Sequence, residues 1–228
     1  MFKESLTMVA TYTTVSGFLC LRNATHFITS NEKPKIYAAC LSAYKKNKVH
    51  GVWVDATQSV KEIELQVSKM VCWSPYLTMH NTTFYAIHCH EGFYNLKLDI
   101  NADIEYIRAQ ALFIAKHGEL GAKLIAHYEG TVEAAEEVIN QRYQGEYNSQ
   151  LEYATQLFDK LYLNTIPEHI QFCVDYEAFK TAIFEHYFFS IELKGMTHVF
   201  FEYLGDWDFR QCLDDFLKPY KCTLPING

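Results

Sequence analysis

The sequence contains few glycines and prolines, and it lacks the motifs of common catalytic centres. Its 228 residues include 10 Gly and 5 Pro, which excludes collagen-like and low-complexity chains. No apolar run approaches the roughly 18 residues that a membrane-spanning helix needs. The sequence also has no phosphate-binding P-loop, no G-x-G-x-x-G and no G-x-S-x-G. We therefore expect a globular protein with no membrane span and no familiar nucleotide or serine-hydrolase site.

The cysteines do not form the pattern of a secreted, disulfide-bonded protein. There are seven, an odd number, and none belongs to a C-x-x-C pair, which indicates reduced intracellular thiols. The apolar stretch near the N-terminus is interrupted by several threonines, among them Thr7, Thr11 and Thr13, so no signal peptide is predicted. These features favour a cytoplasmic protein.

Aromatic residues and acidic residues are what the sequence has in abundance. With 49% hydrophobic residues, 16 Tyr and 16 Phe, the chain can bury a sizeable core. The net charge of −7 is unevenly placed, because residues 129–177 hold ten Asp or Glu and only two Lys or Arg. Such a segment disfavours direct nucleic-acid binding. It favours a basic partner, a cation or simply a solvated acidic face.

The first third of the chain predicts a small β-β-α-β unit. Residues 35–41 and 49–54 have the apolar, β-branched and aromatic character of two strands around a Lys-rich turn. A capping box, Ser59-x-x-Glu62, predicts a helix from about residue 59. Residues 83–90 alternate well enough for a third strand.

Short helices are predicted in the middle of the chain. Asn101 is expected to cap a helix that runs to Lys116, and residues 119–128 predict a second helix. Thr131 is expected to cap a third helix, which reaches Tyr143 and stops at Gly145. A second capping box, Ser149-x-x-Glu152, predicts a fourth helix to about residue 161.

The last part of the chain predicts both helices and strands. Asp175 is expected to cap a helix through Glu185, followed by strands at 188–193 and 198–203. An amphipathic helix is predicted at 207–217, and one or two strands are predicted within residues 1–34. The chain as a whole is therefore predicted to be α+β.

One short stretch could hold a metal ion or a reactive thiol. His88 and His90 are two residues apart, so on a regular strand they face the same side, with Glu91 next in sequence. Two imidazoles and a carboxylate suit zinc or iron, and Cys89 could act as an activated thiol. On a regular strand, however, Cys89 points away from both histidines. An ordinary, half-exposed strand is the simpler interpretation.

Acids interleaved with aromatics over several short helices suggest another role. Glu133, Glu136 and Glu137 fall on one helical face at i, i+3 and i+4. B-DNA displays about one negative charge per 1.7 Å of its axis, and DNA-binding clefts attract that charge. A rigid array of carboxylates can be attracted by the same clefts.

Several motifs in order along the chain resemble the ArdA antirestriction family, and together they cover about residues 35–200. The elements are Ile-Tyr-Ala-Ala-Cys-Leu-Ser-Ala-Tyr at 36–44, Val-His-Gly-Val-Trp-Val-Asp-Ala at 49–56, Ile87 with Glu-Gly-Phe at 91–93, Tyr-x-Gly-Glu-Tyr-x-Ser-x-x-x-Tyr-Ala at 143–154, Val-Asp-Tyr-Glu-Ala-Phe at 174–179, and Val-Phe at 199–200. The chain departs from the family pattern at Cys89 and His90, where the family has Asp and Tyr.

The resemblance implies an elongated, multi-unit α+β fold and a protein that catalyses no reaction. Its implied parts are an N-terminal extension (1–34), an α/β unit (35–97), a helical middle (98–145), an α+β dimerisation unit (146–200) and a C-terminal extension with an amphipathic helix (201–228). It also implies a head-to-head homodimer that imitates bent DNA. Such a dimer occupies the DNA-binding cleft of type I restriction–modification enzymes and protects incoming mobile or phage DNA.

The partner implied by the resemblance is therefore a host restriction–modification enzyme. No cofactor, metal, small-molecule substrate, membrane or directly bound nucleic acid is expected. The residues expected to contact the enzyme are the acids Glu129, Glu133, Glu136, Glu137, Glu146, Glu152, Asp159 and Glu168. One alternative keeps the fold and changes the target to another defence nuclease, such as a CRISPR effector. The other is a metal or thiol enzyme that uses His88, Cys89, His90 and Glu91.

Overall fold

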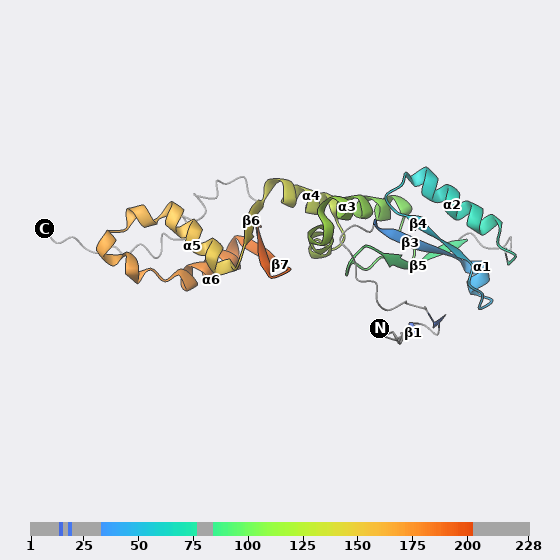
Figure 1. Ribbon diagram of the computed structural model, residues 1–228, viewed down its shortest axis with the longest axis horizontal. Coiled ribbons are helices and arrows are strands. Elements are labelled where there is room, and N and C mark those ends of the chain that lie inside the picture. The colour runs from blue at the N-terminus through green and yellow to red at the C-terminus, as the bar shows by residue number, and fades with distance from the viewer. Residues whose placement is uncertain (1–13, 16–17, 20–32, 77–83, 203–228) are drawn as a thin grey trace, which may run out of the picture. The chain divides into compact units, whose positions relative to one another are not determined.

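A computed structural model describes residues 14–15, 18–19, 33–76 and 84–202, and shows an α+β protein (Figure 1). The chain divides into two compact units, unit 1 (Met1–Val132) and unit 2 (Glu133–Gly228). Each unit contains one three-stranded antiparallel sheet with helices. The predicted α+β class is thereby confirmed. The helix predicted at 207–217 lies outside the described residues, as does most of 1–34, and the five-part division of the chain stays a prediction.

The sheet of unit 1 has the strand order β4-β3-β5. Its strands are β3 (Lys35–Cys40), β4 (Gly51–Asp55) and β5 (Tyr85–Glu91), and both pairings are antiparallel. A short helix, α1 (Leu41–Tyr44), leads from β3 into the Lys-rich turn. Helix α2 (Val60–Cys72) lies between β4 and β5 in the sequence. The predicted β-β-α-β order is confirmed. A separate pair of two-residue strands, β1 (Thr14–Val15) and β2 (Phe18–Leu19), precedes this sheet in the sequence.

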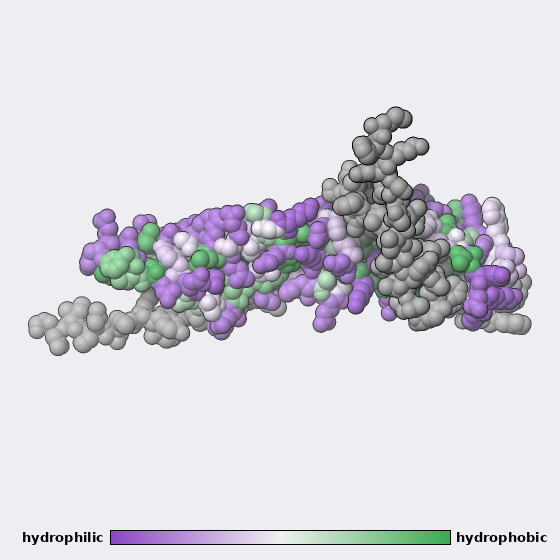
Figure 2. All heavy atoms as spheres, turned by 60° about the horizontal axis from the view of Figure 1, so that its bottom comes forward, coloured by the Kyte–Doolittle hydropathy of each residue, from purple (hydrophilic) through white to green (hydrophobic). Residues whose placement is uncertain are grey.

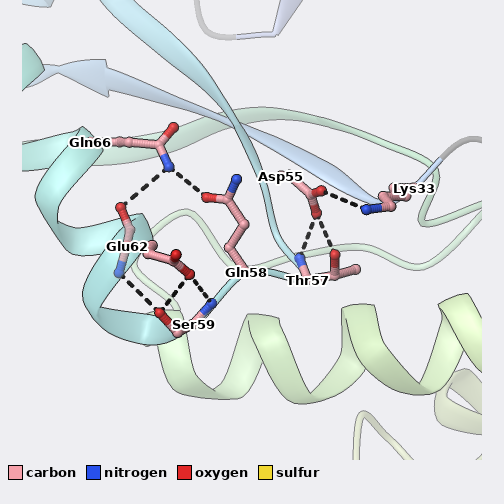
Figure 3. A network of polar contacts seen from close by, with 7 residues as sticks. All are labelled: Lys33, Asp55, Thr57, Gln58, Ser59, Glu62 and Gln66. Atoms are coloured by element: carbon pink, nitrogen blue, oxygen red, sulfur yellow. Dashed lines mark hydrogen bonds and ion pairs between the residues drawn. The ribbon is translucent and has the colours of Figure 1, made fainter.

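Side-chain hydrogen bonds determine where β4 ends and α2 begins (Figure 3). Asp55 Oδ1 accepts hydrogen bonds from the Thr57 amide at 2.8 Å and the Thr57 hydroxyl at 2.6 Å. Ser59 then forms the predicted capping box with Glu62, because each side chain accepts a hydrogen bond from the other residue's amide. These local bonds satisfy amide groups that would otherwise lack partners at the helix start.

The long helix α3 (Ile104–His127) completes the core of unit 1. It buries Ile107, Ile114 and Leu124. The prediction of Asn101 as its cap is wrong, since Asp103 caps it by accepting a hydrogen bond from the Glu105 amide at 3.0 Å. Gly118 adopts a non-helical conformation with φ of 61°, so the expected break occurs there, but the chain resumes a helix at once.

The predicted end of the third middle helix is wrong. Helix α4 (Val132–Gln141) stops before Tyr143, and β6 (Tyr143–Tyr147) follows as a strand. Gly145, expected to stop the helix, lies within this strand with φ of 128°. The strand forms because it pairs with β8 (Met196–Phe201), about 50 residues later in the chain.

The sheet of unit 2 has the strand order β6-β8-β7, with β7 at Phe188–Leu193. Its helices are α5 (Gln150–Leu161), the 3₁₀ segments η1 (Leu163–Thr165) and η2 (Glu168–Cys173), and α6 (Tyr176–His186). Ser149 and Asp175 accept hydrogen bonds at the starts of α5 and α6, as their sequences predict. The strands predicted at 188–193 and from 198 are also found, the second beginning two residues earlier.

Aromatic side chains make most of the core of unit 2. Buried Tyr153, Phe179 and Phe188 are packed with partly buried rings that include Tyr147 and Phe158. Ring pairs such as Tyr153 with Phe188, at a centroid distance of 5.1 Å, adopt the edge-to-face geometry that aromatic quadrupoles favour. Among the helices that the structure describes, none is both long and apolar enough to cross a membrane.

Candidate acidic surface

The two units carry opposite net charge over their described residues. Residues 133–202 of unit 2 hold 12 Asp or Glu and 4 Lys or Arg. In unit 1, the ranges 33–76 and 84–132 together hold 9 acids and 11 bases. Figure 2 shows hydrophilic residues over most of the coloured surface, with hydrophobic residues in small separate patches. The excess of acidic residues therefore lies in unit 2.

Helix α4 presents three glutamates to solvent. Glu133, Glu136 and Glu137 are all exposed, whereas Ala135 and Val138 on the other side of the helix are buried. The face predicted from the i, i+3, i+4 spacing is therefore a solvent-facing one. The Arg142 guanidinium forms an ion pair with Glu137. Glu133 and Glu136 form no ion pair with any of the described residues.

Glu146 and Glu152 extend the acidic character to β6 and the start of α5. Glu146 is exposed on β6, an edge strand of its sheet. Burial, followed by the charge of Glu146, raises the pKa of the Tyr143 phenol. Glu152 accepts hydrogen bonds from the amide and the side chain of Asn148, both at 2.7 Å, and from Gln156 at 3.2 Å. The Glu152 carboxylate is thus fixed in place, but part of its hydrogen-bonding capacity is already used.

Asp159 and Glu168 have different surroundings. Asp159 is half-buried and accepts a hydrogen bond from the Tyr176 hydroxyl at 2.7 Å. That bond is the main cause of the raised pKa of the Tyr176 phenol. Glu168 begins η2 and is exposed. Glu129 is also exposed but belongs to unit 1, where it adopts a positive φ of 51° in the turn between α3 and α4.

The structure thus places six of the eight expected acids on the surface and two at half-buried positions. Unit 2 contains seven of the eight. Three further exposed glutamates of unit 2 lie beyond the acidic 129–177 segment, namely Glu185, Glu192 and Glu202. These three glutamates are not among the candidate acids predicted from the sequence, because only residues 129–177 were considered there. The excess of acids over the whole of unit 2 would have indicated them.

The His88–His90 stretch differs from the regular strand that the sequence predicts. The pairing of β3 with β5 shifts register between Tyr37 and Ala38. In this irregular stretch His88 Nδ1 lies 3.0 Å from Cys89 Sγ, so the expectation that Cys89 points away from both histidines is wrong for His88. His90 instead pairs with the buried Ile36, and its ring contacts Phe93, whereas the His88 ring lies near Tyr37 on the opposite face. The expectation that His88 and His90 face the same side is therefore wrong. Within the described residues, no group of three or more His, Cys, Asp or Glu is arranged to hold a metal ion.

Comparison with protein families decides the classification. The family model described as antirestriction protein (ArdA) matches residues 36–192. The chain belongs to the ArdA family. The match begins in β3 and ends in β7, so this member of the family carries the ArdA pattern in both of its units. All eight expected acids lie inside the matched range, and the resemblance seen in the sequence motifs is confirmed. No curated protein matches the chain at a significant level.

Proposed function

We propose that this antirestriction protein acts as a DNA mimic. Its unit 2 would occupy the DNA-binding cleft of a type I restriction–modification enzyme in the cytoplasm and so protect incoming mobile or phage DNA. No reaction is catalysed, because binding alone blocks the cleft. The observation that carries the proposal is the excess of 12 acids over 4 bases in residues 133–202 of an ArdA protein.

The physical basis is competition for the same basic groups. A cleft that binds duplex DNA uses Lys and Arg side chains, and binding releases the counterions held by the phosphates. Carboxylates on a folded surface can contact the same side chains, although they hold fewer condensed counterions than DNA does. Long-range electrostatic attraction still steers the protein toward the cleft. Glu133 and Glu136 are the most suitable contacts, because both are exposed and neither is neutralised by a described cation.

Dimerisation would strengthen this mimicry. The family resemblance implies a head-to-head dimer through the last part of the chain, which would join two copies of unit 2. Two acidic units in one particle double the number of carboxylates available to a long cleft. The gain in affinity follows from simultaneous engagement of both copies.

The test is inhibition of DNA cleavage by a purified type I enzyme. Replacing Glu133→Gln and Glu136→Gln together removes two unpaired charges from α4, and we expect inhibition to weaken about tenfold, since a charge-assisted contact contributes roughly 0.5–1.5 kcal/mol at such surfaces. The matched control is Glu64→Gln with Glu105→Gln, which removes two exposed charges from unit 1. Equal weakening by the two double variants would contradict the proposal, because it would show an effect of net charge alone.

A second target is favoured by the departures from the family pattern. Unit 1 has more bases than acids over its described residues, and Cys89 and His90 replace the acidic and aromatic residues of the family element. The same fold could therefore inhibit another nuclease of host defence, such as a CRISPR effector. Parallel inhibition assays with both purified enzymes distinguish the two targets.

A further inference from the structure

Two aromatic rings lie side by side on one face of the unit 1 sheet. Tyr37 of β3 and Trp53 of β4 are direct cross-strand partners, with ring centroids 5.3 Å apart. Their neighbours Ile36 and Val54 are buried, so Tyr37 and Trp53 point to the opposite face. Trp53 remains 43% exposed. The Tyr37 ring lies so close to Gly51 that a Cβ there would be 2.6 Å from Tyr37 Cζ, so a side chain at residue 51 would displace this ring.

The line of rings continues toward one end of the sheet. The His88 ring lies 6.4 Å from Tyr37 and 6.0 Å from Tyr44. The irregular pairing of β3 with β5 brings His88 to this position. Tyr44 is the last residue of α1, which lies at the end of the sheet (Figure 1). The rings therefore run from Trp53 to the residue directly before the Lys-rich turn.

That end of unit 1 carries positive charge without acidic neighbours in sequence. Lys45, Lys46 and Lys48 are all exposed, and Lys46 Nζ lies over the Tyr76 ring, 5.5 Å from its centroid. The segment 36–54, which forms most of β3, the turn and most of β4, contains three lysines and no Asp or Glu. The acidic residues of the sheet, Asp55 and Glu91, lie at the opposite end of the strands, where both are cross-strand neighbours of Lys35. Asp55 also forms an ion pair with Lys33 at 3.5 Å.

Rings beside lysines are the combination that recognises single strands. Unpaired bases stack on aromatic side chains, while a basic strip follows the phosphates. Duplex DNA is a poor fit, because its bases are stacked inside the helix and cannot reach a ring on a sheet. We define the lysine–aromatic surface as Tyr37, Tyr44, Trp53, Lys45, Lys46 and Lys48, and we propose that it binds single-stranded nucleic acid. This departs from the expectation, based on the charge of the whole chain, that the protein binds no nucleic acid directly.

Binding can be measured with the full-length protein and a fluorescent oligothymidylate of about 15 nucleotides. This length is sufficient to cover the binding site of one small single-strand-binding domain. We expect saturable binding that weakens with salt, with a log–log slope of about −2 if three lysines meet phosphates. Replacing Lys45→Gln, Lys46→Gln and Lys48→Gln together should weaken binding about tenfold or more. The matched control is Lys61→Gln, Lys97→Gln and Lys116→Gln, three exposed lysines of the same unit outside the surface.

The rings are tested separately from the charge. Trp53→Leu keeps an apolar side chain on the strand and should weaken binding about tenfold through loss of one stacked base, with an unchanged circular dichroism spectrum. Absence of saturable binding, or equal weakening by the two lysine triples, would overturn the proposal. Competition by polyglutamate as strong as that by unlabelled oligothymidylate, together with no effect of Trp53→Leu, would also overturn it and would identify an acidic polypeptide as the ligand.

Discussion

At the residue scale, Tyr153 has a buried hydroxyl that finds no hydrogen-bond partner among the described residues. The surrounding rings keep water away, and burial is the main cause of the raised pKa of this phenol. Removing such a hydroxyl relieves a desolvation cost. We expect Tyr153→Phe to raise the free energy of unfolding by about 1 kcal/mol, measured by urea denaturation.

Tyr176→Phe is the matched comparison, because it removes a hydroxyl that donates to Asp159 at 2.7 Å. This variant should lower the free energy of unfolding, because it removes a satisfied hydrogen bond. If both variants shifted the urea midpoint in the same direction, the assignment of one satisfied and one unsatisfied hydroxyl would be wrong.

Asp55 makes the stability of unit 1 depend on pH. Partial burial raises the pKa of its carboxyl, but hydrogen bonds from Thr57 and the nearby Lys33 ammonium outweigh burial, so the pKa lies below its ordinary value. The stabilisation is therefore present above the unfolded value of about 3.9 and is lost as the pH falls through the folded value. We expect Asp55→Asn to destabilise the protein by about 1 kcal/mol at neutral pH. The difference from the unchanged protein should shrink below about pH 4, and a constant difference across this range would contradict the role given to the charge.

At the scale of elements, two serine caps provide a comparison between the units. The Ser59 hydroxyl accepts a hydrogen bond from the Glu62 amide at 3.3 Å at the start of α2. The Ser149 hydroxyl accepts one from the Glu152 amide at 3.1 Å at the start of α5. Each Ser→Ala variant should cost about 1 kcal/mol. Hydrogen–deuterium exchange should locate the loss of protection in unit 1 for Ser59→Ala and in unit 2 for Ser149→Ala. Equal loss in both units for either variant would show that the units do not unfold separately.

These caps also show which elements the sequence could predict. A capping box is a local pattern, so Ser59 and Ser149 predicted the starts of α2 and α5 correctly. Strand β6 was missed because only five residues form it and its partner β8 is distant in sequence. The contact of His88 with Cys89 was missed because a register shift between paired strands leaves no local pattern.

The same distinction applies to the candidate acids. Their exposure followed from the density of charge in the sequence, because carboxylates rarely enter a core. The sequence could not predict which of these acids form ion pairs or hydrogen bonds with other side chains. The neutralisation of Glu137 depends on Arg142, just beyond the end of α4, and the bond to Asp159 comes from Tyr176 on another helix.

At the scale of the whole molecule, the uneven charge suggests a division of roles between the units. An acidic unit 2 suits a basic cleft, and a lysine–aromatic surface on unit 1 suits a single strand. Because the charges of the two roles are opposite, variants of one unit should leave the other role intact. The α4 glutamate variants should therefore bind oligothymidylate normally, and the lysine triple should inhibit cleavage normally.

The central claim is that carboxylates of unit 2 take the place of DNA phosphates. The most direct test is competition between the protein and duplex DNA for a purified type I enzyme. A fluorescent duplex bound to the enzyme is titrated with the protein at several salt concentrations. We expect complete displacement of the duplex and an affinity for the protein that falls between about 50 and 200 mM salt, because salt screens the attraction between carboxylates and basic side chains. A ternary complex of enzyme, duplex and protein, or an affinity independent of salt, would contradict the claim.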